Sequence, residues 1–99
     1  MRLVIAAAFI AAIPVSAAHA AGDVQAGRAI AETWCKPCHA IAATTGSDVA
    51  TPFSDIAAKR SALAIGAFLA NPHGDMPNIQ LSRTQIDDVI AYMETLKAR

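Results

Sequence analysis

With 99 residues the chain has room for one small domain, and its eight basic residues balance its eight acidic ones. The lack of a basic excess argues against nucleic-acid binding, which depends on cationic side chains facing the phosphates. So small a domain buries too little apolar surface to be securely stable by packing alone. We therefore expect a stabilising disulfide, metal or cofactor.

Residues 1–20 are predicted to be a cleaved secretory signal. Arg2 gives a positive start, residues 3–13 form an uncharged apolar run, and a small-residue cleavage site ends at Ala20. The run is shorter than the roughly 20 residues of a membrane-spanning helix, although an uncleaved anchor is the alternative. The expected product is one domain of residues 21–99, periplasmic or secreted, with seven basic and eight acidic residues.

A first helix is expected to begin after Asp23, a residue type that caps helices well. It should end between Cys35 and His39, because Pro37 cannot continue the backbone hydrogen bonds. One face of this helix carries four residues at helical spacing, namely Gly27, Ile30, Ala31 and Trp34. The glycine lets another backbone approach that face closely.

The middle of the chain predicts a loop and two short helices. Residues 40–51 are small and polar, which favours a surface loop, and Pro52 then opens a short helix. A further helix should start near Ser61 and stop before Asn71, which precedes a proline. The first of these helices contains Phe53 and Ile56, and the second is expected to bury Leu63, Ile65, Phe68 and Leu69.

The last helix follows an irregular loop of residues 72–81 and has the clearest start signal in the chain. Ser82 and Gln85 stand at the positions of a capping box, and Leu81 and Ile86 at those of a hydrophobic staple. An apolar stripe continues from there through Val89, Ile90, Met93 and Leu96. No stretch alternates at period two for long enough to predict a sheet, so the fold class is all-α.

The sequence Cys35-Lys36-Pro37-Cys38-His39 is a C-x-x-C-H motif, which is typical of covalent haem attachment. Two thiols on one tight turn can each bond to a vinyl group of the same porphyrin. The histidine that follows is then placed against the iron from one face. The motif predicts one covalent haem c and its iron, with His39 as the proximal ligand.

The cysteine pair has three other possible interpretations. A disulfide would close a very short loop and stabilise little. A thioredoxin-like redox pair would need a βαβ pattern, which is absent from the sequence. A structural zinc site would need four ligands, and no second cysteine pair exists to complete one.

The second axial ligand of such a haem is expected to be Met76. Methionine is the usual partner of histidine in c-type cytochromes, and Met76 lies in the irregular loop beside Pro77. Met93 belongs to the apolar stripe of the last helix, where a core role is expected. His73 lies three residues before Met76 and is the competing ligand.

Over essentially the whole of residues 21–99 the chain resembles the class I cytochrome c family. The resemblance rests on Gly27 eight residues before the first cysteine, the Cys35–His39 motif, Pro52, Met76-Pro77 and the terminal Ile90-Ala91-Tyr92-Met93. It implies a cytochrome c fold in which the N- and C-terminal helices cross, Gly27 meeting Tyr92, around one covalently bound haem. It also implies that the Pro52 carbonyl accepts the ring N–H of His39.

The resemblance implies a one-electron carrier with no enzymatic turnover, since His39 and Met76 would fill both axial positions of the iron. Its partners would be other redox proteins, with no nucleic acid and no stable membrane insertion after signal cleavage. Two alternatives remain. One is a haem-based ligand sensor or peroxidase-like protein with an open sixth position, and the other is a small haem subunit of a dehydrogenase or oxidase complex.

Overall fold

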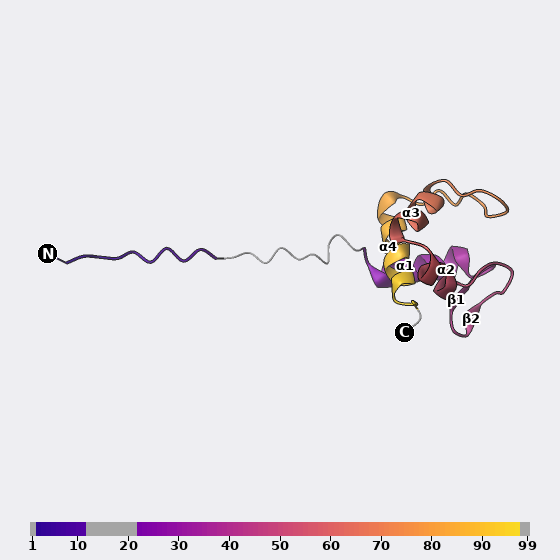
Figure 1. The fold of residues 1–99 in the computed structure, drawn as a ribbon, viewed down its shortest axis with the longest axis horizontal. Coiled ribbons are helices and arrows are strands. Elements are labelled where there is room, and N and C mark those ends of the chain that lie inside the picture. The colour runs from indigo at the N-terminus through magenta and orange to yellow at the C-terminus, as the bar shows by residue number, and fades with distance from the viewer. Residues whose placement is uncertain (1, 12–21, 98–99) are drawn as a thin grey trace.

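The computed structural model describes residues 2–11 and 22–97 (Figure 1). The elements of the second range are α1 (Val24–Ile30), the π-helical turn η2 (Ala31–Cys35), β1 (Ala40–Ala42), β2 (Thr45–Gly46), α2 (Phe53–Lys59), α3 (Ala62–Ala70) and α4 (Arg83–Glu94). The predicted all-α class is confirmed, with one addition. The antiparallel β1–β2 hairpin was not predicted, because strands of three and two residues are too short to show an alternating pattern.

The predicted secretory signal of residues 1–20 remains a prediction. Residue 1 and residues 12–20 lie outside the described part of the chain. Across residues 2–11 and 22–97, no helix has both the length and the apolar character needed to cross a membrane.

The first helix begins at the predicted cap and then changes its pitch. The Asp23 carboxylate accepts a hydrogen bond from the Ala26 N–H over 2.9 Å. From Ala31 the turn widens, and the Lys36 N–H donates to the Ala31 carbonyl five residues back, over 2.9 Å. The wider turn buries Cys35 and leaves Trp34 60% exposed. The placement of Trp34 on the packed face was therefore wrong, because that prediction assumed 3.6 residues per turn throughout.

α1 crosses α4 at backbone contact, and Figure 1 shows the two helices side by side. A Cβ atom on Gly27 would lie 1.8 Å from the Asp88 carbonyl oxygen and 2.9 Å from the Val89 nitrogen. The Asp23 N–H also donates to the buried Asp88 carboxylate, over 2.8 Å. The crossing of the first and last helices is thus present, with Gly27 against the Asp88 backbone and Tyr92 one turn further along α4.

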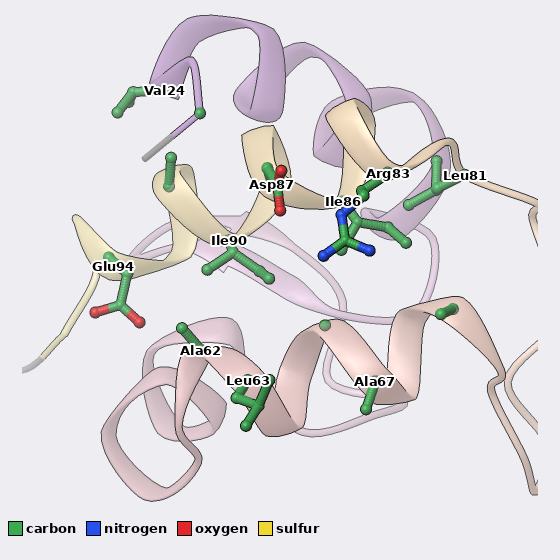
Figure 2. A pocket seen from close by; sticks show the side chains of 14 residues that line it. Val24, Ala62, Leu63, Ala67, Leu81, Arg83, Ile86, Asp87, Ile90 and Glu94 are labelled. Carbon is green, nitrogen blue, oxygen red and sulfur yellow. The ribbon is translucent and has the colours of Figure 1, made fainter. Parts of the chain in front are cut away.

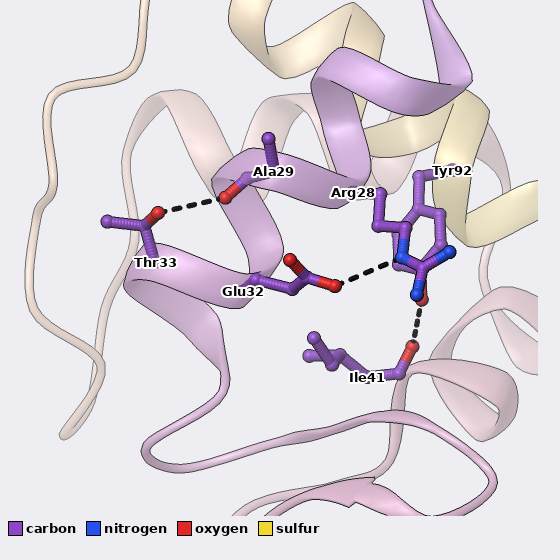
Figure 3. A network of polar contacts seen from close by, with 6 residues as sticks. All are labelled: Arg28, Ala29, Glu32, Thr33, Ile41 and Tyr92. Atoms are coloured by element: carbon purple, nitrogen blue, oxygen red, sulfur yellow. Dashed lines mark hydrogen bonds and ion pairs between the residues drawn. The ribbon is translucent and has the colours of Figure 1, made fainter.

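Tyr92 joins α4 to the hairpin (Figure 3). Its hydroxyl donates to the Ile41 carbonyl over 2.5 Å, and both residues are buried. The exposed Thr33 hydroxyl makes a similar bond to the Ala29 carbonyl over 2.9 Å. Burial raises the pKa of Tyr92 above its ordinary value of 10. The two hydroxyls therefore differ mainly in how far they are shielded from water.

A Tyr92→Phe variant is expected to lose about 1–2 kcal/mol of unfolding free energy, because the Ile41 carbonyl is left buried without a donor. Urea denaturation of the haem-loaded protein measures this loss. Thr33→Ala is the matched control and should stay within about 0.5 kcal/mol of wild type. The raised pKa adds stability that is complete below pH 10 and disappears as pH rises through the folded-state pKa. A Phe variant equal to wild type at neutral pH would contradict this account.

The three later helices begin at their predicted caps. Pro52 precedes α2, and the Ser61 hydroxyl accepts the Ala64 N–H at the start of α3 over 3.1 Å. Both bonds of the capping box at α4 are present, over 2.8 and 3.1 Å, between Ser82 and Gln85. These signals could be found from sequence because each involves residues at most three positions apart.

α3 is apolar on two sides. Ile65 and Leu69 are buried as predicted, and Phe68 is half-buried. Leu63, predicted to be buried, is 85% exposed and lies with Ala67 along a hollow of about 890 Å³ between α3 and α4 (Figure 2). The prediction failed for Leu63 because a helix that is apolar all round does not reveal which side faces the core.

Candidate functional site

A second cavity, of about 850 Å³, brings the predicted site residues together. Its walls include Cys35, Cys38, His39 and Met76, and also the rival ligand His73. α2, α3 and α4 add apolar side chains, among them Phe53, Ile65, Leu69 and Val89. A volume of this size lies within the range of pockets that bind cofactors.

The two cysteines are free thiols that differ in exposure. The wide turn of η2 places Cys35 in the buried wall, and burial raises the pKa of its thiol to about 11. Cys38 is exposed, and its N–H donates to the Cys35 carbonyl over 3.2 Å. One compact turn therefore presents both sulfur atoms to the same cavity, as attachment to a single porphyrin requires.

His39 is oriented by backbone groups. Its Nδ1 atom lies 2.6 Å from the Thr51 carbonyl oxygen, and its N–H donates to the Cys35 carbonyl over 2.9 Å. Because a carbonyl only accepts, Nδ1 carries the ring proton and leaves Nε2 free to bind a metal. The ring packs at a tilt against Phe53, with centroids 5.4 Å apart.

The carbonyl that accepts from His39 is not the predicted one. Pro52 was expected in this role, and the residue before it, Thr51, occupies the position. The Pro52 carbonyl instead accepts the N–H groups of Asp55 and Ile56, each over 3.1 Å, at the start of α2. Pro52 contributes indirectly, because a proline restricts the backbone of the residue before it and so limits the directions that the Thr51 carbonyl can take.

The hairpin loop folds back over the motif and holds it in place. The Ser47 N–H donates to the His39 carbonyl over 3.1 Å, and the Ala50 N–H donates to the Cys38 carbonyl over 2.7 Å. Gly46 has a φ of +118°, and a Cβ atom there would lie 2.1 Å from the His39 carbonyl oxygen. Only glycine fits this position, and its close contact with the His39 carbonyl helps to hold His39 in place.

The surroundings of the two candidate methionines differ from those of His73. Met93 is in the buried core, as predicted, while Met76 is half-buried and packs against that core from the loop. The exposed His73 ring packs edge-on against Phe68, with centroids 4.8 Å apart. The choice between Met76 and His73 as iron ligand remains a prediction.

The residues of the cavity fit a covalently attached haem. Two free thiols, an imidazole nitrogen fixed in one tautomer and a thioether lie on the walls of one largely apolar space. When bound, the haem supplies an iron that accepts and releases one electron. Cys35 and Cys38 would attach it through their sulfur atoms, and the His39 ring, oriented by the Thr51 carbonyl, would present Nε2 to the iron.

Sequence reasoning missed three contributors to the site. Thr51 was read as part of a surface loop, although its position before a proline was a usable signal. The contact of Phe53 with His39 and the closure by Gly46 depend on tertiary structure and leave no local pattern.

Comparison with known proteins also supports a covalently attached haem. The family model for cytochrome c matches residues 24–97. The chain is 35% identical over 82 residues to a cytochrome c-552 of Bradyrhizobium diazoefficiens, a match covering 78% of each protein. No solved structure matches the chain at a significant level.

Proposed function

The chain belongs to the cytochrome c family and is a haem electron carrier with covalently bound haem c, and we propose that it transfers single electrons in the periplasm with His39 and Met76 as axial ligands. Cys35 and Cys38 would hold the haem through thioether bonds. With both axial positions filled, the protein would have no open site for substrate and no enzymatic turnover.

The observation that carries this proposal is the convergence of Cys35, Cys38, His39 and Met76 on one cavity. Met76 comes from a loop that begins more than thirty residues after the motif, so local sequence does not bring it there. The bond between His39 and the Thr51 carbonyl supports proximal ligation, because such a bond makes the ring more basic and fixes its direction.

Met76 is favoured over His73 by its surroundings. It is partly buried against the core, whereas the His73 ring is exposed and already packs against Phe68. A thioether ligand also keeps the reduction potential high, which suits a carrier. Periplasmic location follows from the predicted signal of residues 1–20 and is part of the proposal. Its redox partners would be other proteins of that compartment.

Voltammetry of the haem-loaded protein tests the proposal. We expect one reversible wave with the slope of a one-electron couple, and no change of the reduced spectrum when CO is added at neutral pH. CO binding by the native protein would indicate an open sixth position and would favour the ligand sensor. Stable co-purification with a dehydrogenase or oxidase would assign the chain as a subunit of that complex.

A further inference from the structure

α3 lies at the surface of the molecule although it has no polar side chain. All nine of its residues, Ala62–Ala70, are apolar or glycine. Ile65 and Leu69 are buried on the side that lines the haem cavity. The other side, which carries Leu63, lines the hollow of about 890 Å³ between α3 and α4 (Figure 2). A helix that is apolar all round is typically buried on every side, so a partner is expected to cover this one.

The hollow combines a protruding leucine with a wall of small residues. Leu63 is 85% exposed, and no part of residues 2–11 and 22–97 covers it. Ile86 and Ile90 of α4 form the opposite wall. The other α3 residues that line the hollow are Ala62, Gly66, Ala67 and Ala70. One surface thus offers both an apolar side chain to insert and an apolar space to receive one, as a self-complementary contact requires.

Charges of opposite sign stand at the two ends of the hollow. Arg83 is the first residue of α4 and Glu94 the last, and both line the hollow. Arg83 is exposed and forms no ion pair in the described part of the chain. Glu94 Oε2 pairs with Lys97 Nζ over 2.7 Å, while Oε1 is buried without a hydrogen-bond partner among the same residues. A free guanidinium and a carboxylate able to accept from a second cation therefore flank one apolar surface.

We propose that the hollow between α3 and α4 binds a second copy of this chain, in an antiparallel pair that joins Arg83 of each copy to Glu94 of the other. Leu63 of each copy enters the hollow of the other copy. This pairing goes beyond the proposed electron transfer and does not depend on it.

The distribution of charge selects the antiparallel arrangement. Arg83 and Glu94 are the two ends of a twelve-residue helix, about 16 Å apart along its axis. A two-fold axis perpendicular to the middle of α4 brings Arg83 of one copy opposite Glu94 of the other, and symmetry repeats the contact. An axis parallel to α4 would instead place Arg83 against Arg83 and Glu94 against Glu94, which repel each other.

Asp87 is the remaining charged residue of the hollow. It follows Arg83 by four positions, a spacing that makes the two side chains neighbours on the helix, so Arg83 also offsets its charge. Under the same two-fold axis Asp87 lies opposite Ile90 of the second copy and not opposite another aspartate. Asp87 is therefore compatible with the antiparallel pair.

The interface would be small and its pairing weak. α3 and α4 are about 14 and 18 Å long, and two such helices cover less than the roughly 800 Å² per partner of a standard stable complex. We expect a pair that is populated at about 1 mM chain and dissociates by about 1 μM. The haem cavity lies on the other side of α3, so each copy would keep that cavity open to a redox partner.

Charge reversals at the two ends test the pairing. In Arg83→Glu alone, and in Glu94→Arg alone, both end contacts would join like charges, so each variant should dimerise at least about tenfold more weakly than wild type. Mixed together, the two variants should form a pair of near wild-type strength, because both end contacts then join opposite charges. Both reversals suit the dipole of α4, so the monomers should stay folded. Sedimentation equilibrium of haem-loaded proteins with the wild-type visible spectrum measures the dissociation constants.

Leu63→Ser tests the apolar part of the contact. It should weaken the pair by about tenfold or more, because two leucines per dimer lose their burial. Val49→Ser is the matched control. Val49 is also an exposed apolar residue, at 76%, but it lies along the haem cavity and should leave the dissociation constant unchanged.

A wild-type protein that stays monomeric at about 1 mM would overturn the proposed pairing and leave the electron carrier intact. A mixture of the two reversal variants that associates no better than either alone would also overturn it, because Arg83 and Glu94 would then not meet. Mass spectrometry identifies the other possible occupants. A monomer that retains residues 3–13, or that co-purifies with another protein, would assign the hollow to that segment or that protein instead.

Discussion

A Met76→Ala variant is expected to lose the weak long-wavelength absorption band that arises from a sulfur–iron bond. Its reduction potential should fall by on the order of 0.2 V, because thioether ligation raises the potential within the roughly 0.8 V that axial ligands control. The reduced protein should also bind CO, since removing the side chain opens the sixth position. Visible spectra of both oxidation states and voltammetry measure all three changes.

Two control variants separate Met76 from its rivals. Met93→Leu keeps the volume of a core side chain and should retain the sulfur band, at a cost below about 1.5 kcal/mol. His73→Gln should retain both the band and the potential, because the His73 ring packs against Phe68 at the surface. A sulfur band that survives in Met76→Ala, or that disappears in His73→Gln, would contradict the assignment of Met76.

Gly27→Ala should be among the most destabilising single changes in the chain. The added methyl group would lie 1.8 Å from the Asp88 carbonyl oxygen, so α1 and α4 must move apart. Backbone cannot rotate away as a side chain can, and we expect a loss of about 3 kcal/mol or more. For a domain of this size the melting temperature should fall by roughly 15 °C. Thermal unfolding of the haem-loaded protein, followed by circular dichroism, measures this loss.

Gly66→Ala is the matched control, since Gly66 also lies inside a helix. Its added methyl group would meet only side-chain atoms, Ile90 Cδ1 at 3.4 Å and Ile86 Cγ2 at 3.8 Å. The variant should be neutral or more stable by about 0.5–1 kcal/mol, because alanine favours the helix. Similar melting temperatures for Gly27→Ala and wild type would show that the helices do not cross at backbone contact.

The features that sequence analysis predicted correctly have local causes. The C-x-x-C-H motif lies within five residues, and the caps at Asp23, Ser61 and Ser82 each bond to a residue three positions ahead. The close approach at Gly27 was also foreseen, since a glycine on a helix face has few other reasons to be there.

The features that were missed depend on tertiary packing. The π-helical turn buries Cys35 and leaves Trp34 exposed. The spacing of apolar residues in the sequence does not predict such a change of helical pitch. The error at Leu63 arose because α3 has apolar residues on both sides. The carbonyl that accepts from the His39 ring was predicted to be that of Pro52, but it is that of Thr51. The Pro52 carbonyl accepts hydrogen bonds in the first turn of α2 instead.

The most direct test of the central claim is whether haem stays on the denatured chain. The protein is exported from cells that contain haem-maturation machinery, purified, unfolded in alkaline pyridine and examined by absorption and mass spectrometry. We predict one haem per chain in wild type, with the spectrum of two saturated vinyl groups, and none in Cys35→Ser/Cys38→Ser. A wild-type chain that carries no haem, or releases it on unfolding, would contradict covalent attachment at Cys35 and Cys38.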